Sequence, residues 1–165
     1  MKSDQRDRYK DEIFKFLLKI KFDEPIAVTL TEKQCVVGYG DTKFYINNVR
    51  SSVNTKHFLN RLNQKIFKNS YRRFGKRLKS FVVMEGTDTI RHHIHLVLDK
   101  PNRVSFEDFK NLINDCWLKT TFGYHHTDVQ QMYSDGWYSY LIKCRTKTDL
   151  LSDIDWQNTY SGVSK

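Results

Sequence analysis

The sequence has few cysteines and no long apolar segment. Cys35, Cys116 and Cys144 are odd in number and far apart, so they give neither a disulfide framework nor the Cys-x-x-Cys spacing of a zinc site. Reduced thiols in a cytosol-like compartment are the simplest interpretation. The N-terminus lacks a signal-peptide pattern, and no run approaches the roughly 20 apolar residues of a membrane span. We therefore expect a soluble, intracellular protein with no membrane partner.

Acidic residues are also in deficit. The chain has 28 Lys and Arg against 19 Asp and Glu, a formal charge of +9. Such a balance is typical of proteins that bind polyanions, most commonly nucleic acid. The charge is concentrated in residues 61–79, which contain no acidic residue. This segment is a candidate for phosphate contact because phosphate affinity depends on local cation density, although a solvated helix face is the alternative.

The 165 residues suit a single domain with a core of its own. Hydrophobic residues make up 39% and aromatic residues 14%, which excludes a disordered chain. We expect one domain over 1–165, with an N-terminal helix in 1–22, a core in 26–147 and a C-terminal tail in 148–165.

Apolar periodicity predicts alternating helices and strands around an antiparallel hairpin. The predicted helices are 4–21, one capped by Ser51–Ser52 and ending near 69, 106–116 and 137–146. The predicted strands are 26–31, 81–85, 92–98 and 127–132. We expect a loop or hairpin over 36–46 and a basic loop over 70–79. The pattern indicates an α+β fold in which helices pack on a sheet.

One predicted strand carries two histidines at alternate positions. His93 and His95 share one face of the strand, roughly 7 Å apart, because successive side chains point to opposite faces. Two imidazoles at this separation can bind one metal ion from the same side. Ile94, Leu96 and Leu98 occupy the other face, where a core requires them. The strand can therefore pack and hold a metal at once.

Glu85 ends the preceding strand of the same hairpin and is the candidate third ligand. Two histidines and one carboxylate leave positions open for substrate oxygens, which is the pattern of a catalytic metal site. Mixed oxygen and nitrogen ligation suits Mg²⁺ or Mn²⁺ when a phosphate shares the coordination sphere. His125 and His126 are better explained as a solvated loop.

A later segment pairs a tyrosine with a lysine. On a helix, Tyr140 and Lys143 lie three residues apart and share a face. A nearby ammonium and a metal-bound phosphate would both stabilise negative charge as a phenol attacks. Tyr138 points about 200° away from Tyr140, so only one of the two can face the metal. The position of Lys143 favours Tyr140.

In this order the motifs resemble the HUH endonuclease superfamily. Residues 27–31 are similar to its first motif, His93-Ile94-His95 to its second and Tyr140-Leu141-Ile142-Lys143 to its third. The pattern is most similar to rolling-circle replication initiators, the Rep proteins of small viruses, phages and plasmids. The resemblance implies a ferredoxin-like or RRM-like antiparallel sheet packed with helices. It also implies nicking of single-stranded DNA at an origin, usually near a hairpin, with covalent attachment of the protein.

Carried onto this chain, the resemblance assigns a role to each motif. Glu85, His93 and His95 would hold Mn²⁺ or Mg²⁺. Tyr140 would attack the scissile phosphate to leave a 5′-phosphotyrosine, and Lys143 would position the phosphate or favour the phenolate. Tyr71 or Phe74 could stack on a base. The cations expected to hold the DNA backbone are Arg72, Arg73, Lys76, Arg77 and Lys79.

The sequence also departs from many viral Rep proteins. It lacks a Gly-x-x-x-x-Gly-Lys-Ser/Thr loop, so we expect a separate helicase or an isolated domain of a larger protein. The expected compartment is the cytoplasm, or the host-cell nucleus for a eukaryotic virus. Two alternatives stay open: a single-tyrosine transposase or relaxase of the same superfamily, and a non-catalytic nucleic-acid-binding module. The latter would display exposed aromatics on its central strands, where this chain has His93, His95 and Val97.

Overall fold

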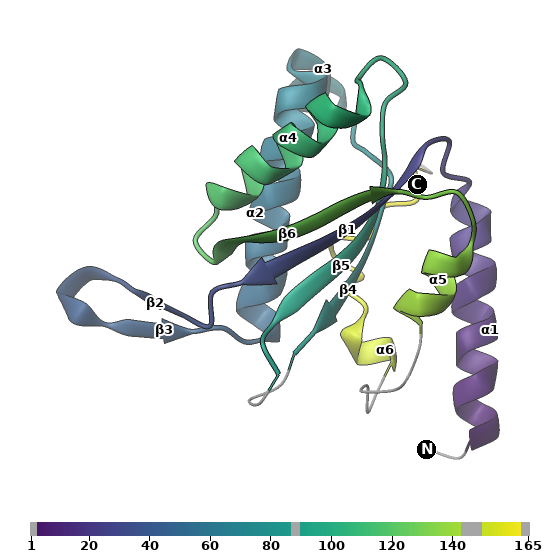
Figure 1. Ribbon diagram of the computed structural model, residues 1–165, viewed down its shortest axis with the longest axis horizontal. Helices are drawn as coiled ribbons and strands as arrows, with labels where there is room; N and C mark the ends of the chain where they lie inside the picture. Colours follow the sequence, from purple (N-terminus) through teal and green to yellow (C-terminus); the bar gives the residue numbers. More distant parts are fainter. Residues whose placement is uncertain (1–2, 87–89, 143–149, 163–165) are drawn as a thin grey trace.

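The computed structural model describes residues 3–86, 90–142 and 150–162 (Figure 1). The strands are β1 (Pro25–Glu32), β2 (Cys35–Val37), β3 (Lys43–Tyr45), β4 (Ser80–Glu85), β5 (His93–Asp99) and β6 (Gly123–Gln131). The helices are α1 (Ser3–Ile20), α2 (Asn48–Phe67), α3 (Asn69–Phe74), α4 (Phe106–Leu118), α5 (Gly136–Leu141) and α6 (Leu150–Asp153). A short 3-10 turn, η1 (Tyr39–Asp41), joins β2 to β3.

Four strands form one antiparallel sheet in the order β4–β5–β1–β6. Along the chain, β1, α2, β4, β5, α4 and β6 make the β-α-β-β-α-β unit of the ferredoxin-like fold. The expected α+β fold class, a ferredoxin-like or RRM-like antiparallel sheet packed with helices, is confirmed. The hairpin β2–β3 is inserted between β1 and α2 and forms a second, two-stranded sheet.

Helices cover both faces of the four-stranded sheet (Figure 1). Even-numbered residues of β1 and β5, such as Val28 and Leu96, pack with α2 and α4 in the larger core cluster. Odd-numbered residues such as Val97 pack with α1, α5 and Ile154 in a second cluster. The alternation of side chains along each strand therefore feeds two separate cores. No helix among the described ranges is long and apolar enough to span a bilayer.

Two local predictions were wrong. Helix α2 begins at Asn48, and its N-cap is Asn47, whose side chain accepts a hydrogen bond from Arg50 N at 2.9 Å. The predicted cap residue Ser51 is instead buried one turn inside the helix. Asn caps helices as well as Ser does, so either residue fits the local pattern. The predicted basic loop over 70–79 begins as the short helix α3, which ends at Gly75 in a left-handed conformation.

The C-terminal segment closes the β4 edge of the sheet. Tyr160 exchanges two backbone hydrogen bonds with Ser80, at 2.8 and 2.9 Å, and Asp155 N donates to Val82 O at 2.9 Å. These contacts cover an edge strand that would otherwise expose unpaired backbone groups. The last predicted helix, 137–146, is seen as α5, and its predicted part from residue 143 onward lies outside the described residues.

Glu32, the last residue of β1, carries a buried carboxyl group between the sheet and α2. Burial raises its pKa to about 7, and a long hydrogen bond from Asn54 Nδ2, at 3.5 Å, offsets only part of this effect. The folded state therefore binds a proton more tightly than the unfolded chain does. Its stabilising effect is complete below about pH 4.5 and is lost as the pH rises to about 7.

We expect Glu32→Gln to remove this pH dependence. The free energy of unfolding of the wild type, minus that of the variant, should fall by about 3 kcal/mol between pH 4.5 and 7, since one pKa unit corresponds to about 1.4 kcal/mol. Urea unfolding across this range measures the difference. Glu107→Gln, at an exposed position of α4, is the control. Parallel pH profiles for the wild type and Glu32→Gln would contradict the prediction.

Candidate metal centre

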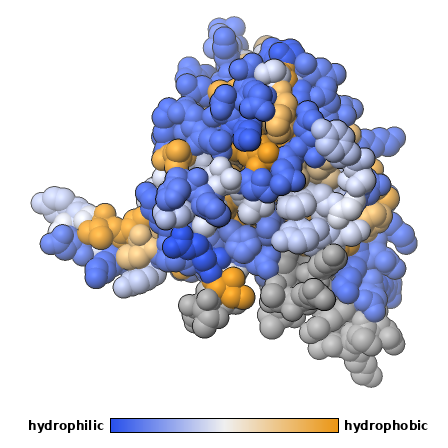
Figure 2. All heavy atoms as spheres, viewed as in Figure 1, coloured by the Kyte–Doolittle hydropathy of each residue, from blue (hydrophilic) through white to orange (hydrophobic). Residues whose placement is uncertain are grey.

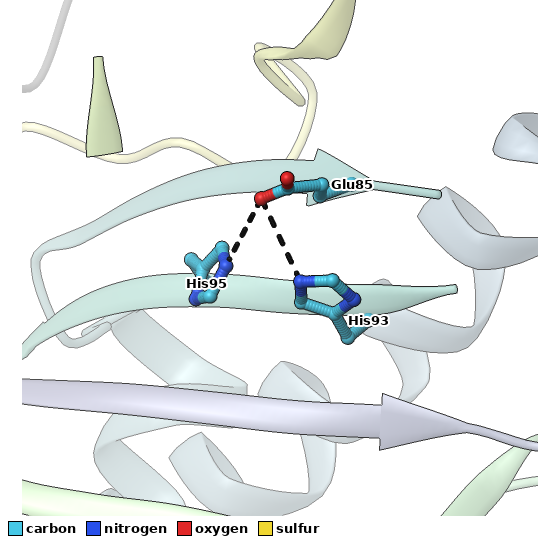
Figure 3. A group of neighbouring side chains, drawn as sticks. All are labelled: Glu85, His93 and His95. Carbon is cyan, nitrogen blue, oxygen red and sulfur yellow. Dashed lines mark ion pairs between the residues drawn. The ribbon is translucent and has the colours of Figure 1, made fainter. Parts of the chain in front are cut away.

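Antiparallel pairing of β4 with β5 brings three potential metal ligands together (Figure 3). Glu85 lies directly opposite His93, and His95 lies opposite Val83, two residues further along the ladder. Glu85 Oε2 is 3.6 Å from His93 Nε2 and 3.2 Å from His95 Nε2. One ligand atom from each of the three residues lies within 4.8 Å of the others. The structure thus brings together the three residues that the sequence nominates.

Both imidazoles are oriented by a hydrogen bond at Nδ1. His93 Nδ1 lies 2.9 Å from the carbonyl oxygen of Arg91. A carbonyl only accepts, so Nδ1 carries the proton and Nε2 keeps its lone pair. His95 Nδ1 lies 3.0 Å from the hydroxyl of Thr29 on β1, a contact that sequence reasoning did not anticipate. Metal-binding histidines commonly have such outer partners, which fix the ring and its tautomer.

The geometry fits a divalent ion. Adjacent ligands of an octahedral Mg²⁺ or Mn²⁺ site, at metal distances near 2.1 Å, stand about 3.0 Å apart. The two measured carboxylate–imidazole separations are close to this value and need little movement to reach it. His95 is only 3% exposed, whereas the side chains of His93 and Glu85 are partly exposed. The cluster is therefore anchored on one side and accessible to a substrate on the other.

Helix α5 brings aromatic side chains to the same face. The Tyr140 ring lies 5.5 Å from the His95 ring in an edge-to-face arrangement, and 47% of the residue is exposed. The indole of Trp137 stacks on Tyr140 at 4.8 Å and also contacts the His95 ring at 5.7 Å. Trp137 was missed by sequence reasoning, although its spacing three residues before Tyr140 places both on one helix face.

The other tyrosine of α5 is part of the core. Tyr138 is 5% exposed and contacts the rings of Phe14 and Phe22. Burial raises its pKa to about 12, with smaller contributions from the charges of Asp135 and Asp99. Its phenol is thus harder to ionise than a free tyrosine. Lys143, the other residue of the predicted pair, lies outside the described residues.

The predicted DNA-binding cations lie far from the cluster. They surround α3 and the chain leading into β4, whereas Glu85 ends that strand, about 17 Å further along at 3.3 Å per residue. Arg72, Arg73, Lys76 and Arg77 are exposed to solvent. Lys79 differs, because its ammonium group lies 3.3 Å from both Asp23 and Asp99. Its charge is therefore already compensated within the protein.

The two candidate stacking residues also differ in exposure. Phe74 is 81% exposed. Tyr71 is partly buried, its hydroxyl donates to Asn60 Oδ1 at 2.8 Å, and the guanidinium of Arg77 lies 5.8 Å from its ring centroid. Of the two, only Phe74 presents an unobstructed ring.

A ferredoxin-like sheet that presents a glutamate and two histidines on one face defines an α+β protein with a candidate metal centre. Comparison with protein families places the chain further. The family model for replication-associated protein ORF2 matches residues 25–149, from the start of β1 past α5. The chain belongs to this family and is a replication-associated protein of the Rep type. Searches of curated proteins and of solved structures each found no match.

We expect His93→Gln to weaken Mn²⁺ binding by more than about 100-fold, because it removes a direct ligand rather than an outer partner. Isothermal titration calorimetry with MnCl₂ measures the affinity. His57→Ala, at an exposed position of α2 on the other side of the sheet, is the control. Wild-type affinity in His93→Gln would mean that the cluster is not the metal site.

We expect Thr29→Val to weaken Mn²⁺ binding about tenfold, because it removes the hydrogen bond to His95 Nδ1 at nearly constant volume. Thr29→Ser keeps the hydroxyl and should restore most of the affinity. The same titration compares the three proteins. Equal affinities would show that Thr29 does not orient the ligand.

Proposed function

We propose that this protein nicks and rejoins single-stranded DNA at a replication origin, with Tyr140 as the nucleophile. The observation that carries the proposal is the contact between the Tyr140 ring and His95, a member of the candidate metal cluster. A partly exposed phenol beside two imidazoles and a carboxylate is suited to phosphoryl transfer. Membership of a replication-associated family supplies the substrate class.

Glu85, His93 and His95 are the residues that would hold the ion, for which Mn²⁺ and Mg²⁺ suit the donor set best. Bound there, the ion would supply Lewis-acid polarisation of the scissile phosphate. The protein's contribution is to keep the ligands fixed, through Thr29 and the Arg91 carbonyl, and one side of the site open.

Tyr140 supplies the nucleophile from within the chain. Its phenolic oxygen forms a bond to the phosphorus as the bond to the 3′ oxygen breaks. The products are a 5′-phosphotyrosine and a free 3′-hydroxyl, which takes up the proton. Attack by a 3′-hydroxyl on that linkage reverses these bond changes and rejoins a strand. Tyr138 is unsuited to this role, because it is buried and its pKa is raised to about 12.

Trp137 is a positioning residue for the nucleophile. Its indole lies between the second core and the site, stacked on Tyr140 with an interplanar angle of 20°. Aromatic stacking restricts the rotamers of Tyr140 and so lowers the entropy cost of reaching an attack geometry. Lys143, three residues beyond Tyr140, is proposed to stabilise negative charge on the phosphate or phenolate.

The exposed cations around α3 are proposed to hold the DNA backbone away from the site of cleavage. At 3.4 Å per nucleotide of one strand, about 17 Å corresponds to roughly five nucleotides from the scissile phosphate. Arg72, Arg73, Lys76 and Arg77 are therefore placed to contact a flanking part of the origin, such as a hairpin arm. The sequence has no phosphate-binding loop of the helicase type, so strand separation is assigned to a separate helicase protein or domain.

We expect a covalent adduct between the protein and single-stranded DNA in the presence of Mn²⁺. A random-sequence oligonucleotide pool labelled at its 3′ end should shift to the protein band on a denaturing gel. The same pool labelled at its 5′ end should yield only shorter free DNA, because the protein joins the 5′ phosphate of the downstream fragment. EDTA should abolish both products.

The matched variants are Tyr140→Phe, which should lose the adduct entirely, and Tyr138→Phe, which should retain it. An adduct that persists in Tyr140→Phe would refute the assigned nucleophile. An adduct that carries the 5′ label would refute the polarity. Tight DNA binding without any adduct would favour a non-catalytic binding module.

A further inference from the structure

The hairpin β2–β3 projects from the body of the protein as an arm, residues 35–45 (Figure 1). Its two short strands pair with each other, Cys35 opposite Tyr45 and Val37 opposite Lys43. Hairpins of two strands are marginally stable in water without a packed face. The arm therefore costs free energy to maintain, which calls for a partner surface.

The arm exposes large apolar side chains, which are visible beyond the body of the protein in Figure 2. Tyr39, at the tip, is fully exposed, and Tyr45 and Val37 are 61% and 62% exposed. Phe44 points to the opposite face, where it contacts Gly38 and lies under the Arg50 guanidinium. One face of the arm is thus packed internally, while the tyrosines face solvent.

Cations accompany these rings. Residues 33–50 contain Lys33, Lys43 and Arg50 against a single acidic residue, Asp41. Lys43 follows the tip and shares the open face with Tyr45, since residues two apart in a strand point the same way. Exposed rings interleaved with cations are the composition of surfaces that bind single-stranded nucleic acid, where rings stack on bases and cations neutralise phosphates.

The root of the arm is tied to the metal centre. Gln34 Oε1 accepts a hydrogen bond from the backbone N–H of His92 at 3.2 Å, and His92 directly precedes the ligand His93. The carbonyl of Gln34 also accepts from Ile46 N at 2.9 Å, which joins the two legs of the arm. The arm therefore leaves the sheet at the end that carries the candidate ligands, opposite to the end that carries α3.

We propose that the arm binds the single-stranded DNA that enters the metal centre, with Tyr39 and Tyr45 stacking on unpaired bases and Lys43 contacting a phosphate. This inference rests on the proposed function for the identity of the strand. It assigns the contacts nearest to the scissile phosphate to the arm and leaves the cations around α3 for more distant DNA. Base stacking is tolerant of sequence, so the arm would hold the strand without selecting the origin.

The test measures binding of a fluorescein-labelled oligo(dT) of about 20 nucleotides to the full chain by fluorescence anisotropy. EDTA is present, so no cleavage chemistry contributes to the signal. We expect Tyr39→Ser with Tyr45→Ser to lose about tenfold in affinity per ring. Tyr39→Phe with Tyr45→Phe should bind like the wild type, because the rings remain. Tyr133→Ser is the control, since Tyr133 is 89% exposed and follows β6 near the opposite end of β1.

Wild-type affinity in the double serine variant would refute the proposal. So would an equal loss of affinity for a dT·dA duplex of the same length, which would make the arm a duplex-binding element. A wild-type dimer that the double serine variant converts to a monomer, with unchanged DNA binding, would assign the arm to self-association. Arm-dependent binding without a covalent adduct would refute the nicking proposal alone, whereas an adduct with no arm effect would refute the arm alone.

Discussion

The antiparallel register between β4 and β5 is the constraint on which the candidate site depends. It sets Glu85 opposite His93 and leaves His95 two residues further on, so three polar side chains meet at one end of the hairpin. A slip of one residue would turn Glu85 to the other face of the sheet. The register is held by the apolar side chains of β5, because Ile94, Leu96 and Leu98 must reach the core under α2 and α4.

The second face of the sheet is divided between packing and chemistry. At one end, α1 and α5 bury Phe81, Val83 and Val97. At the other end the same face carries the Glu85, His93 and His95 cluster. Helix α5 lies at the boundary, with Tyr138 in the core and Tyr140 against His95. One short helix thus uses buried area to hold a reactive side chain in place, which is how a rigid support keeps a site organised.

The candidate site could be read from the sequence to the extent that it is local. His93 and His95 are two residues apart on one strand, and Glu85 is joined to them by a short turn, so strand alternation alone predicts their meeting. Tyr140 over Tyr138 was likewise predictable from helical spacing. The Thr29 hydroxyl, by contrast, is 66 residues from His95. No local pattern connects them, because only the pairing of β1 with β5 makes them neighbours.

Charge was a poorer guide to position. The run of cations in residues 61–79 predicted nucleic-acid contact near the site, but the fold places its last part at the opposite end of β4 from Glu85. The arm near the ligands has few charges, and its aromatic residues read as an ordinary hairpin in one dimension. By itself the sequence determined the alternating faces of the strands and therefore the ligand triad and the ferredoxin-like class. Only the tertiary structure decided which surfaces lie beside that triad, because strand order and helix packing join segments that no sequence period links.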